Sequence, residues 1–174
     1  MTNIGTELQR IESQKADFFD FERKAQGYLD EIYKSLGAEI VTRKGDTKRD
    51  VVLSYDGKEH KVEEKIRDVS ISGKGDVAIE VLQAMESPQA ERFLGWFYTE
   101  GFDRLVYAWC EKETGKPVKV LSFDWARFKL WLLNWLCKKK FIGALVSCKG
   151  WGKTLNLLIP MRDIPEVLYK ILAG

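Results

Sequence analysis

The sequence predicts an α/β fold in a single domain that spans residues 1–174. Apolar residues recur at helical spacing over residues 7–36 and again over 124–139, while the stretches around Asp56-Gly57 have the alternation and turn residues of paired strands. A chain of 174 residues with 45% hydrophobic residues is long enough to bury one core and leaves little room for two domains.

The first predicted element is a long amphipathic helix over residues 7–36, with Gly37 as its expected end. The apolar residues of this stretch mostly follow helical spacing: Leu8, Ile11, Phe18, Phe21, Ala25, Tyr28, Leu29, Ile32 and Leu36. Residues 38–43 then predict a first strand ahead of a polar turn.

Residues 50–55 and 60–67 are predicted to pair as a hairpin, because Asp56-Gly57 between them is a strong turn signal. Residues 77–82 predict a further strand. The stretch 84–102 predicts an irregular or short helical segment rich in aromatic residues, of the kind that often contacts substrates.

Two more strands, 103–110 and 118–121, are predicted to be joined by a turn at Gly115-Lys116-Pro117. A helix over 124–139 follows, with Ser122 or Asp124 as its N-cap. Four apolar residues form a stripe on this helix that is more typical of a core than of a binding site: Phe128, Leu132, Trp135 and Leu136.

The end of the chain is predicted to be structured. Residues 142–148 and 154–159 predict a second hairpin, around a loop rich in glycine and lysine. Pro165 is expected in the first turn of a short last helix that ends near Ala173.

Charged residues around the first hairpin suggest a metal-dependent site. Because side chains alternate along a strand, Glu63 and Lys65 are predicted to share one face, and Glu64 the other. The hairpin carries Asp50 toward the end of the strand that bears Glu63, and Asp46 is the second candidate for its role. Carboxylate oxygens suit Mg²⁺, and a nearby lysine can orient a water molecule for attack on a phosphodiester. Taken alone, a Glu-x-Lys strand is more often an ordinary solvated surface.

Residues from about 18 to 110 resemble the PD-(D/E)xK nuclease superfamily, whose members run helix, strand, strand with Asp, then strand with (Asp/Glu)-x-Lys. Ile79-Glu80 and the strand from Phe102 to Tyr107 resemble motifs of a phage and mobile-element branch of that family. Two departures are that Arg49, not proline, precedes Asp50, and that the middle residue of Glu-x-Lys is a second acid, Glu64.

The resemblance implies a restriction-endonuclease-like fold, a mixed β-sheet flanked by helices. It also implies an endonuclease that hydrolyses DNA with Mg²⁺, for which Mn²⁺ can substitute. Asp50 and Glu63 would be metal ligands and Lys65 would orient the attacking water. A first-helix glutamate often completes the metal site in this family, which points to Glu22. Glu80 would bind the metal or brace Lys65. A solvated Glu22 and a structural ion pair at Glu80 are the alternatives.

Composition adds bounds on the kind of partner. The net charge is only +2, so the whole-chain balance does not indicate a nucleic-acid binder. The N-terminus lacks a secretion-signal pattern, and the longest apolar stretch, near 128–136, is too short to span a bilayer. We therefore expect a cytoplasmic protein without a membrane partner. Three widely spaced cysteines, Cys110, Cys137 and Cys148, are expected to be reduced and buried.

Two other classes of function compete with a nuclease. One is a catalytically inactive protein of the same fold that binds nucleic acid or a protein partner; the other is an unrelated α/β interaction protein. The residues fit double-stranded, single-stranded or branched DNA, or RNA, equally well. Cutting both strands of a duplex commonly needs two active sites and would favour a homodimer.

Overall fold

The computed structural model describes residues 4–43, 51–70, 75–82, 96–98, 101–138 and 155–174. It has a mixed α/β architecture with a six-stranded sheet in the order β1-β2-β3-β5-β6-β8 and a two-stranded sheet of β4 and β7. The larger sheet contains β1 (Glu39–Arg43), β2 (Val51–Tyr55), β3 (Lys58–Asp68), β5 (Arg104–Cys110), β6 (Pro117–Asp124) and β8 (Tyr169–Ala173). The smaller sheet contains β4 (Asp76–Leu82) and β7 (Leu155–Pro160).

The larger sheet is mixed because β3 and β5 run parallel while its other neighbouring strands are antiparallel. The parallel pair is central, and β4 lies in the connection between its two strands. The predicted strands at 38–43, 50–55, 60–67, 77–82, 103–110 and 118–121 are confirmed, apart from Asp50, which lies outside the described residues.

The hairpin of β2 and β3 closes at Asp56 and Gly57, as the sequence predicts. Both residues have positive φ, 52° and 72°, as a two-residue type I′ hairpin turn requires. Val51 pairs with Val62 and Tyr55 with Lys58, so this turn also fixes the register of the strand that carries Glu-x-Lys.

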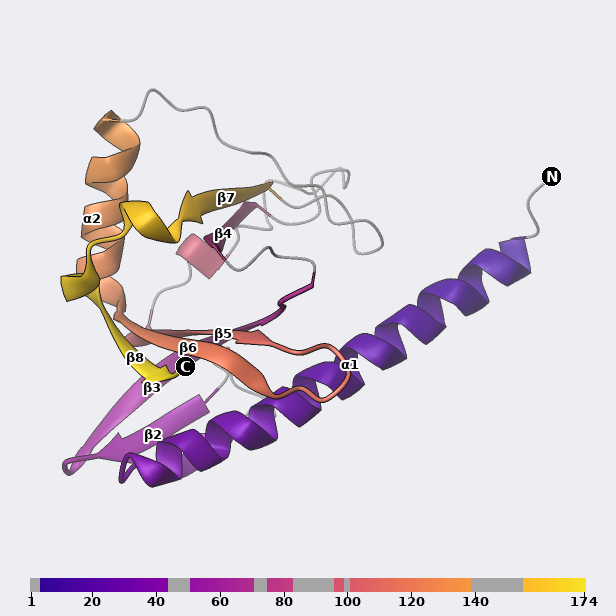
Figure 1. Ribbon diagram of the computed structural model, residues 1–174, viewed down its shortest axis with the longest axis horizontal. Helices are drawn as coiled ribbons and strands as arrows, with labels where there is room; N and C mark the ends of the chain where they lie inside the picture. Colours follow the sequence, from indigo (N-terminus) through magenta and orange to yellow (C-terminus); the bar gives the residue numbers. More distant parts are fainter. Residues whose placement is uncertain (1–3, 44–50, 71–74, 83–95, 99–100, 139–154) are drawn as a thin grey trace.

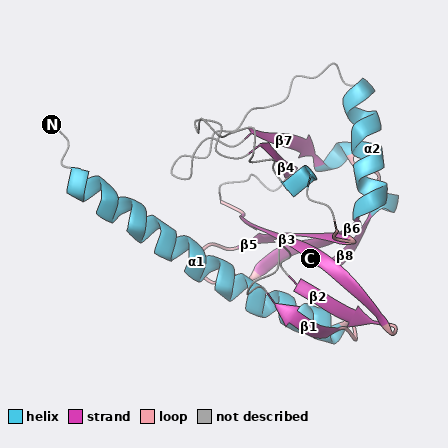
Figure 2. Cartoon of the chain, turned by 180° about the vertical axis from the view of Figure 1, so that it is seen from behind, coloured by secondary structure: helices cyan, strands magenta, loops and turns pink. Residues whose placement is uncertain are grey.

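Helix α1 (Ile4–Ser35) confirms the predicted N-terminal helix and lies across one face of the larger sheet, extending beyond it (Figures 1 and 2). Among its described side chains, those of Phe21, Ala25, Leu29 and Tyr33 are buried. They form an apolar cluster with Val62 and Ile66 of β3 and Val106 of β5. The even-numbered residues of β3 in this stretch therefore face α1.

The smaller sheet and helix α2 (Trp125–Lys138) lie on the opposite side of the larger sheet (Figures 1 and 2). The larger apolar cluster fills this side and includes Leu105 and Tyr107 of β5, Ile79 of β4 and Phe128 of α2. Of the two predicted caps, Ser122 and Asp124, Asp124 caps α2: its Oδ1 accepts a hydrogen bond of 3.1 Å from the backbone N–H of Arg127.

The prediction of a last helix was wrong. After Pro165 the chain makes one short 3₁₀ turn, Glu166–Leu168, and then forms strand β8, which pairs antiparallel with β6. A strand at this position forms hydrogen bonds with the backbone donors and acceptors along the outer edge of β6. A helix there would leave those groups of β6 without a neighbouring strand. This tertiary pairing outweighs the local preference of the sequence.

The other predictions for the C-terminal half of the chain are confirmed in part. Residues 155–160 form a strand as expected, and the partner that the structure gives them is β4. The expected partner, 142–148, lies outside the described residues. Of the predicted irregular segment at 84–102, a 3₁₀ turn at Trp96–Tyr98 is described. Within the described part of the chain, no helix is long and apolar enough to cross a membrane.

Candidate functional site

Glu63 and Lys65 are neighbours on one face of β3, as strand alternation predicts. The Lys65 ammonium group donates a short hydrogen bond to Oε1 of Glu63. Across the parallel ladder, Glu63 lies beside Leu105 and Lys65 beside Tyr107. Because Leu105 and Tyr107 belong to the larger apolar cluster, this ion pair lies on the side of the sheet that faces the smaller sheet and α2.

This ion pair is largely withdrawn from water. The side chain of Glu63 is 9% exposed and that of Lys65 is 18% exposed. Removing a carboxylate and an ammonium from water costs several kcal/mol per ion. The attraction between the two ions has about the same magnitude, so the pair gains little net stability from being buried. An ordinary solvated strand face would leave both charges in water, so burial sets this pair apart from the surface Glu-x-Lys patterns that occur by chance.

Two more cations follow the same alternation along β3. Lys61 and Arg67 lie on the face of Glu63 and Lys65, two residues away on either side. The guanidinium carbon of Arg67 is 5.8 Å from the centre of the Tyr107 ring, within cation–π range. Lys61 and Arg67 were not among the predicted site residues, although the alternation that selects Glu63 and Lys65 selects both of them as well.

Tyr107 connects this face to the smaller sheet. Its hydroxyl oxygen accepts a hydrogen bond of 3.1 Å from the backbone N–H of Ala78 in β4. The Tyr107 side chain, itself fully buried, therefore fixes the distance between the larger sheet and β4 next to Lys65. Tyr107 thus joins the two sheets at the position beside Lys65.

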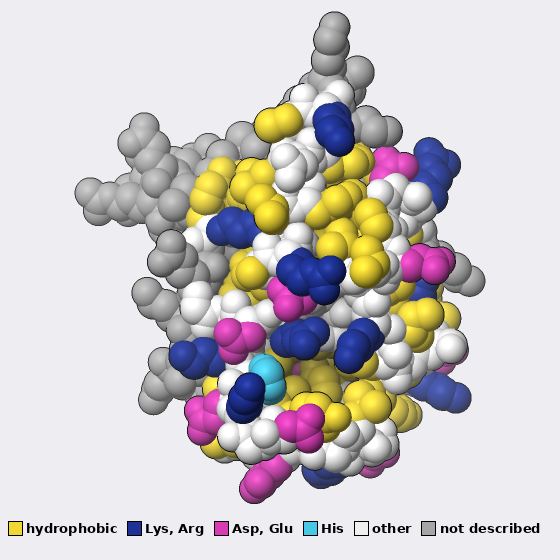
Figure 3. All heavy atoms as spheres, turned by 90° about the vertical axis from the view of Figure 1, so that its left-hand side faces the viewer, with side chains coloured by type: hydrophobic (Ala, Val, Ile, Leu, Met, Phe, Trp, Pro, Cys, Tyr) yellow, Lys and Arg dark blue, Asp and Glu magenta, His cyan; other side chains and the backbone are white. Residues whose placement is uncertain are grey.

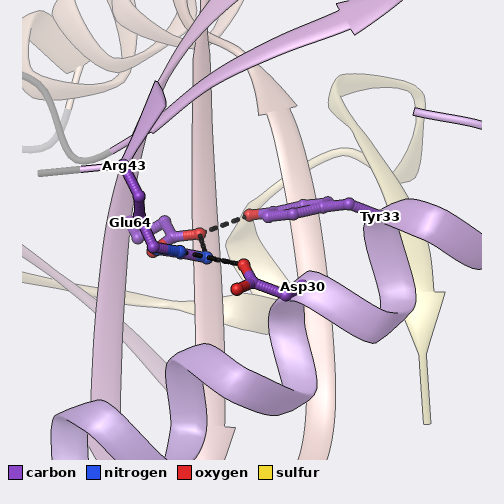
Figure 4. Close-up of polar contacts among 4 residues, drawn as sticks. All are labelled: Asp30, Tyr33, Arg43 and Glu64. Atoms are coloured by element: carbon purple, nitrogen blue, oxygen red, sulfur yellow. Dashed lines mark hydrogen bonds and ion pairs between the residues drawn. The ribbon is translucent and has the colours of Figure 1, made fainter. Parts of the chain in front are cut away.

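Glu64 lies on the other face of β3, in a polar network with α1 and β1 (Figure 4). Its Oε1 accepts a hydrogen bond of 2.8 Å from the hydroxyl of Tyr33, and its Oε2 accepts one of 2.7 Å from Arg43. Arg43 also donates to Asp30 through Nε, at 2.9 Å. The two acids of the Glu-Glu-Lys sequence thus have different partners on opposite faces.

Burial and charge shift the ionisation of this network. Burial, followed by the charge of Glu64, raises the pKa of Tyr33 well above its usual value. Burial alone would lower the pKa of Arg43, but its hydrogen bonds to Glu64 and Asp30 outweigh that effect and raise the pKa. Tyr33 is therefore a neutral donor and Arg43 a permanent cation at physiological pH.

Two other predicted site residues, Glu22 and Glu80, lie on other elements than β3. Glu22 lies on α1, which covers the face opposite to that of Glu63. Glu80 lies on β4, where alternation puts it on the strand face away from the buried residues Val77 and Ile79. Across the described ranges, no three acidic, histidine or cysteine residues are grouped as a metal ion would need. Asp50 and its alternative Asp46 lie outside the described residues.

The cysteines differ from each other. Cys110 is buried in β5 and free of disulfide bonding, and burial raises the pKa of its thiol to about 12. Cys137 is also free but exposed near the end of α2, so the expectation that it is buried was wrong. An exposed residue fits the solvent-facing side of this amphipathic helix. Cys148 lies outside the described residues.

The surface view in Figure 3 shows basic, acidic and hydrophobic side chains interspersed on one side of the molecule. This mixture agrees with the net charge of +2.

No protein-family model matches this chain, and neither a curated protein nor a solved structure is detectably similar to it.

Proposed function

We propose that this protein is a Mg²⁺-dependent endonuclease of restriction-endonuclease-like fold that hydrolyses DNA phosphodiester bonds. The observation that carries the proposal is the ion pair of Glu63 and Lys65, 9% and 18% exposed, on one face of a central strand. A buried carboxylate beside a half-buried amine is the kind of arrangement that active sites maintain at a cost in stability.

The third member of the proposed site is Asp50. Val51 pairs with Val62 in the antiparallel hairpin, and these residues are the direct chain neighbours of Asp50 and Glu63. The sequence-based prediction that the hairpin carries Asp50 toward Glu63 is the basis for this assignment. Two carboxylates can share one cation, and oxygen ligands are those that Mg²⁺ prefers.

The roles of the residues follow from this arrangement. Asp50 and Glu63 would hold Mg²⁺, which lowers the pKa of a bound water and offsets charge on the phosphate. Lys65 would orient the attacking water and release Glu63 to the cation as the substrate's negative charge enters the site. Lys61 and Arg67, on the same face, would bind the phosphates that flank the scissile one. Glu22 and Glu80 stay predicted helpers whose contribution mutation can test.

The order of elements also supports the proposal. Helix α1, strand β1, strand β2 and the Glu-x-Lys strand β3 follow one another as the resembled nucleases do, and more strands and a helix follow. The resemblance to a phage and mobile-element branch rests on two motifs. One is Ile79-Glu80, and the other is the predicted strand from Phe102 to Tyr107. DNA is the substrate that this branch suggests, and a duplex substrate would favour a homodimer.

The test is a cleavage assay on plasmid, linear single-stranded and branched DNA with Mg²⁺, with Mn²⁺ or with EDTA. Wild type is compared with Asp50→Asn and Lys65→Ala, and with Lys58→Ala, which removes an exposed lysine of the same strand. We expect metal-dependent cleavage that falls at least about 100-fold in the first two variants and stays unchanged in Lys58→Ala.

Circular dichroism must show that every variant is folded. Absence of cleavage on all substrates, together with no Mn²⁺-dependent rise in the melting temperature of wild type, would refute the nuclease. DNA binding without cleavage would then point to the catalytically inactive protein of the same fold.

A further inference from the structure

A charged network lies directly behind the proposed site, within the apolar cluster that α1 forms with the larger sheet. Its members are Asp30 and Tyr33 of α1, Arg43 of β1 and Glu64 of β3 (Figure 4). The side chain of Glu64 is only 2% exposed, while those of Arg43 and Asp30 are 21% and 26% exposed. The network therefore joins three elements through one buried carboxylate.

Stability alone is a weak reason for such a network. Breaking a buried ion pair is costly, but replacing the whole of it by apolar residues of similar size is often neutral or stabilising. The surroundings of Glu64 are apolar, because Val62, Ile66 and Val106 belong to the same cluster. Methionine or phenylalanine could fill this space. The presence of charged residues joined by directional hydrogen bonds therefore needs a reason other than stability.

Geometry supplies that explanation. Glu64 stands between Glu63 and Lys65 in β3, so a fixed Glu64 side chain fixes the pleat that aims its two neighbours at the opposite face. Arg43 is the last residue of β1 and pairs with Val51, the first residue of β2. Its guanidinium group joins Glu64 of β3 to Asp30 of α1, while its backbone pairs with the start of β2.

We propose that Asp30, Tyr33, Arg43 and Glu64 are positioning residues for the ion pair of Glu63 and Lys65. This inference rests on the proposed nuclease function and adds a second layer to it, on the far face of the same strands. Fixed supports of this kind matter because a displacement of about 1 Å at reacting groups can cost about 100-fold in rate.

The decisive variant replaces the whole network by uncharged residues of similar size: Asp30→Asn, Tyr33→Phe, Arg43→Met and Glu64→Met together. We expect its melting temperature to stay near that of wild type, its KM for DNA to change little, and its kcat to fall at least 10-fold. Its affinity for Mn²⁺ should fall 10- to 100-fold, as when the residues that orient metal ligands are removed.

Leu53→Met is the matched control, because Leu53 is buried in the same cluster and methionine has a similar volume. It should keep wild-type kcat and Mn²⁺ affinity. A network variant that is stable and fully active would overturn the proposal. Should the fourfold variant fail to fold, Tyr33→Phe alone removes one hydrogen bond and must still lower kcat or Mn²⁺ affinity, and unchanged values would overturn the proposal as well.

Hydrogen exchange separates this inference from the nuclease proposal, because it needs neither substrate nor metal. The backbone amides of Glu63 and Lys65 should exchange at least 10-fold faster in the network variant, while that of Leu121 in β6 keeps its wild-type rate. An active wild type with unchanged exchange and kcat in the variant refutes the positioning role alone. A wild type without cleavage or Mn²⁺ binding refutes the nuclease, and the exchange rates then still decide whether the network fixes β3.

Discussion

At the scale of single residues, the hydroxyl of Tyr33 makes stability depend on pH. Burial and the charge of Glu64 raise its pKa well above the ordinary value of 10.0. Above pH 10 the unfolded chain releases the phenol proton while the folded protein retains it. The folded state then binds more protons than the unfolded state, so the free energy of unfolding must fall as pH rises.

Urea unfolding between pH 8 and 11 measures this effect. Below pH 10 the Tyr33 contribution is fully present, and above it the loss approaches about 1.4 kcal/mol per pH unit for one proton. Tyr33→Phe should remove this part of the pH dependence. Tyr98→Phe, which deletes an exposed hydroxyl, should keep the wild-type curve. Identical slopes in wild type and Tyr33→Phe would show that the buried phenol is not responsible.

The same scale shows what sequence alone can predict about the candidate site. The shared face of Glu63 and Lys65 follows from alternation, which depends only on the backbone of one strand. The partners of Glu64 do not, because Tyr33 and Arg43 precede it by 31 and 21 residues. Contacts over such separations depend on how a helix packs on a sheet, and residue spacing carries no signal for them.

At the scale of elements, one close contact sets how the turn between β5 and β6 meets α1. Gly115 in this turn has φ +71°, and a Cβ atom there would lie 2.7 Å from Cβ of Lys24 and 2.8 Å from the backbone nitrogen of Ala25. The backbone of a helix cannot move aside easily. Gly115 therefore meets both a steric and a conformational requirement.

We predict that Gly115→Ala is much more destabilising than Gly57→Ala. Gly57 has nearly the same φ, +72°, but no atom lies within 4 Å of the position that a Cβ atom would take there. Gly57→Ala should lower the free energy of unfolding by about 1–2 kcal/mol, the cost of placing alanine in the left-handed conformation. Gly115→Ala should cost about 1–3 kcal/mol more, from overpacking against α1. Chemical unfolding of both variants checks this difference, and equal losses would mean that the turn can shift away from the helix.

The elements that the sequence predicts well are those whose own residues decide the outcome. Helix α1 has helical periodicity along most of its length, and β2 and β3 have a turn signal between them. Strand β8 lacks such a signal, because the residues that follow Pro165 are compatible with a helix as well as with a strand. Its pairing with β6 is a property of the assembled sheet, which supplies an edge to be covered.

At the scale of the whole molecule, the larger sheet divides the chain into a structural side and a candidate functional side. Helix α1 covers one face, with the network of Glu64 beneath it (Figures 1 and 4). The pair of Glu63 and Lys65 lies on the other face. The parallel pairing of β3 with β5 makes the Glu-x-Lys strand central rather than peripheral. A central strand is among the last parts of a fold to open locally, which suits a site that must hold its geometry.

A metal ion that binds only the folded chain must stabilise the whole molecule by mass action. At a Mn²⁺ concentration of about 100 times Kd the gain is about 2.7 kcal/mol. For a chain of this size that corresponds to a rise in melting temperature of roughly 5–10 °C. Glu63→Gln should abolish the rise, because it removes a proposed ligand, and EDTA should reverse it in wild type. Glu59→Gln changes an exposed acid on the same strand and face, so it should leave the rise intact. A rise that survives Glu63→Gln would assign Mn²⁺ to other acids of the chain and would contradict the site on which the nuclease proposal depends.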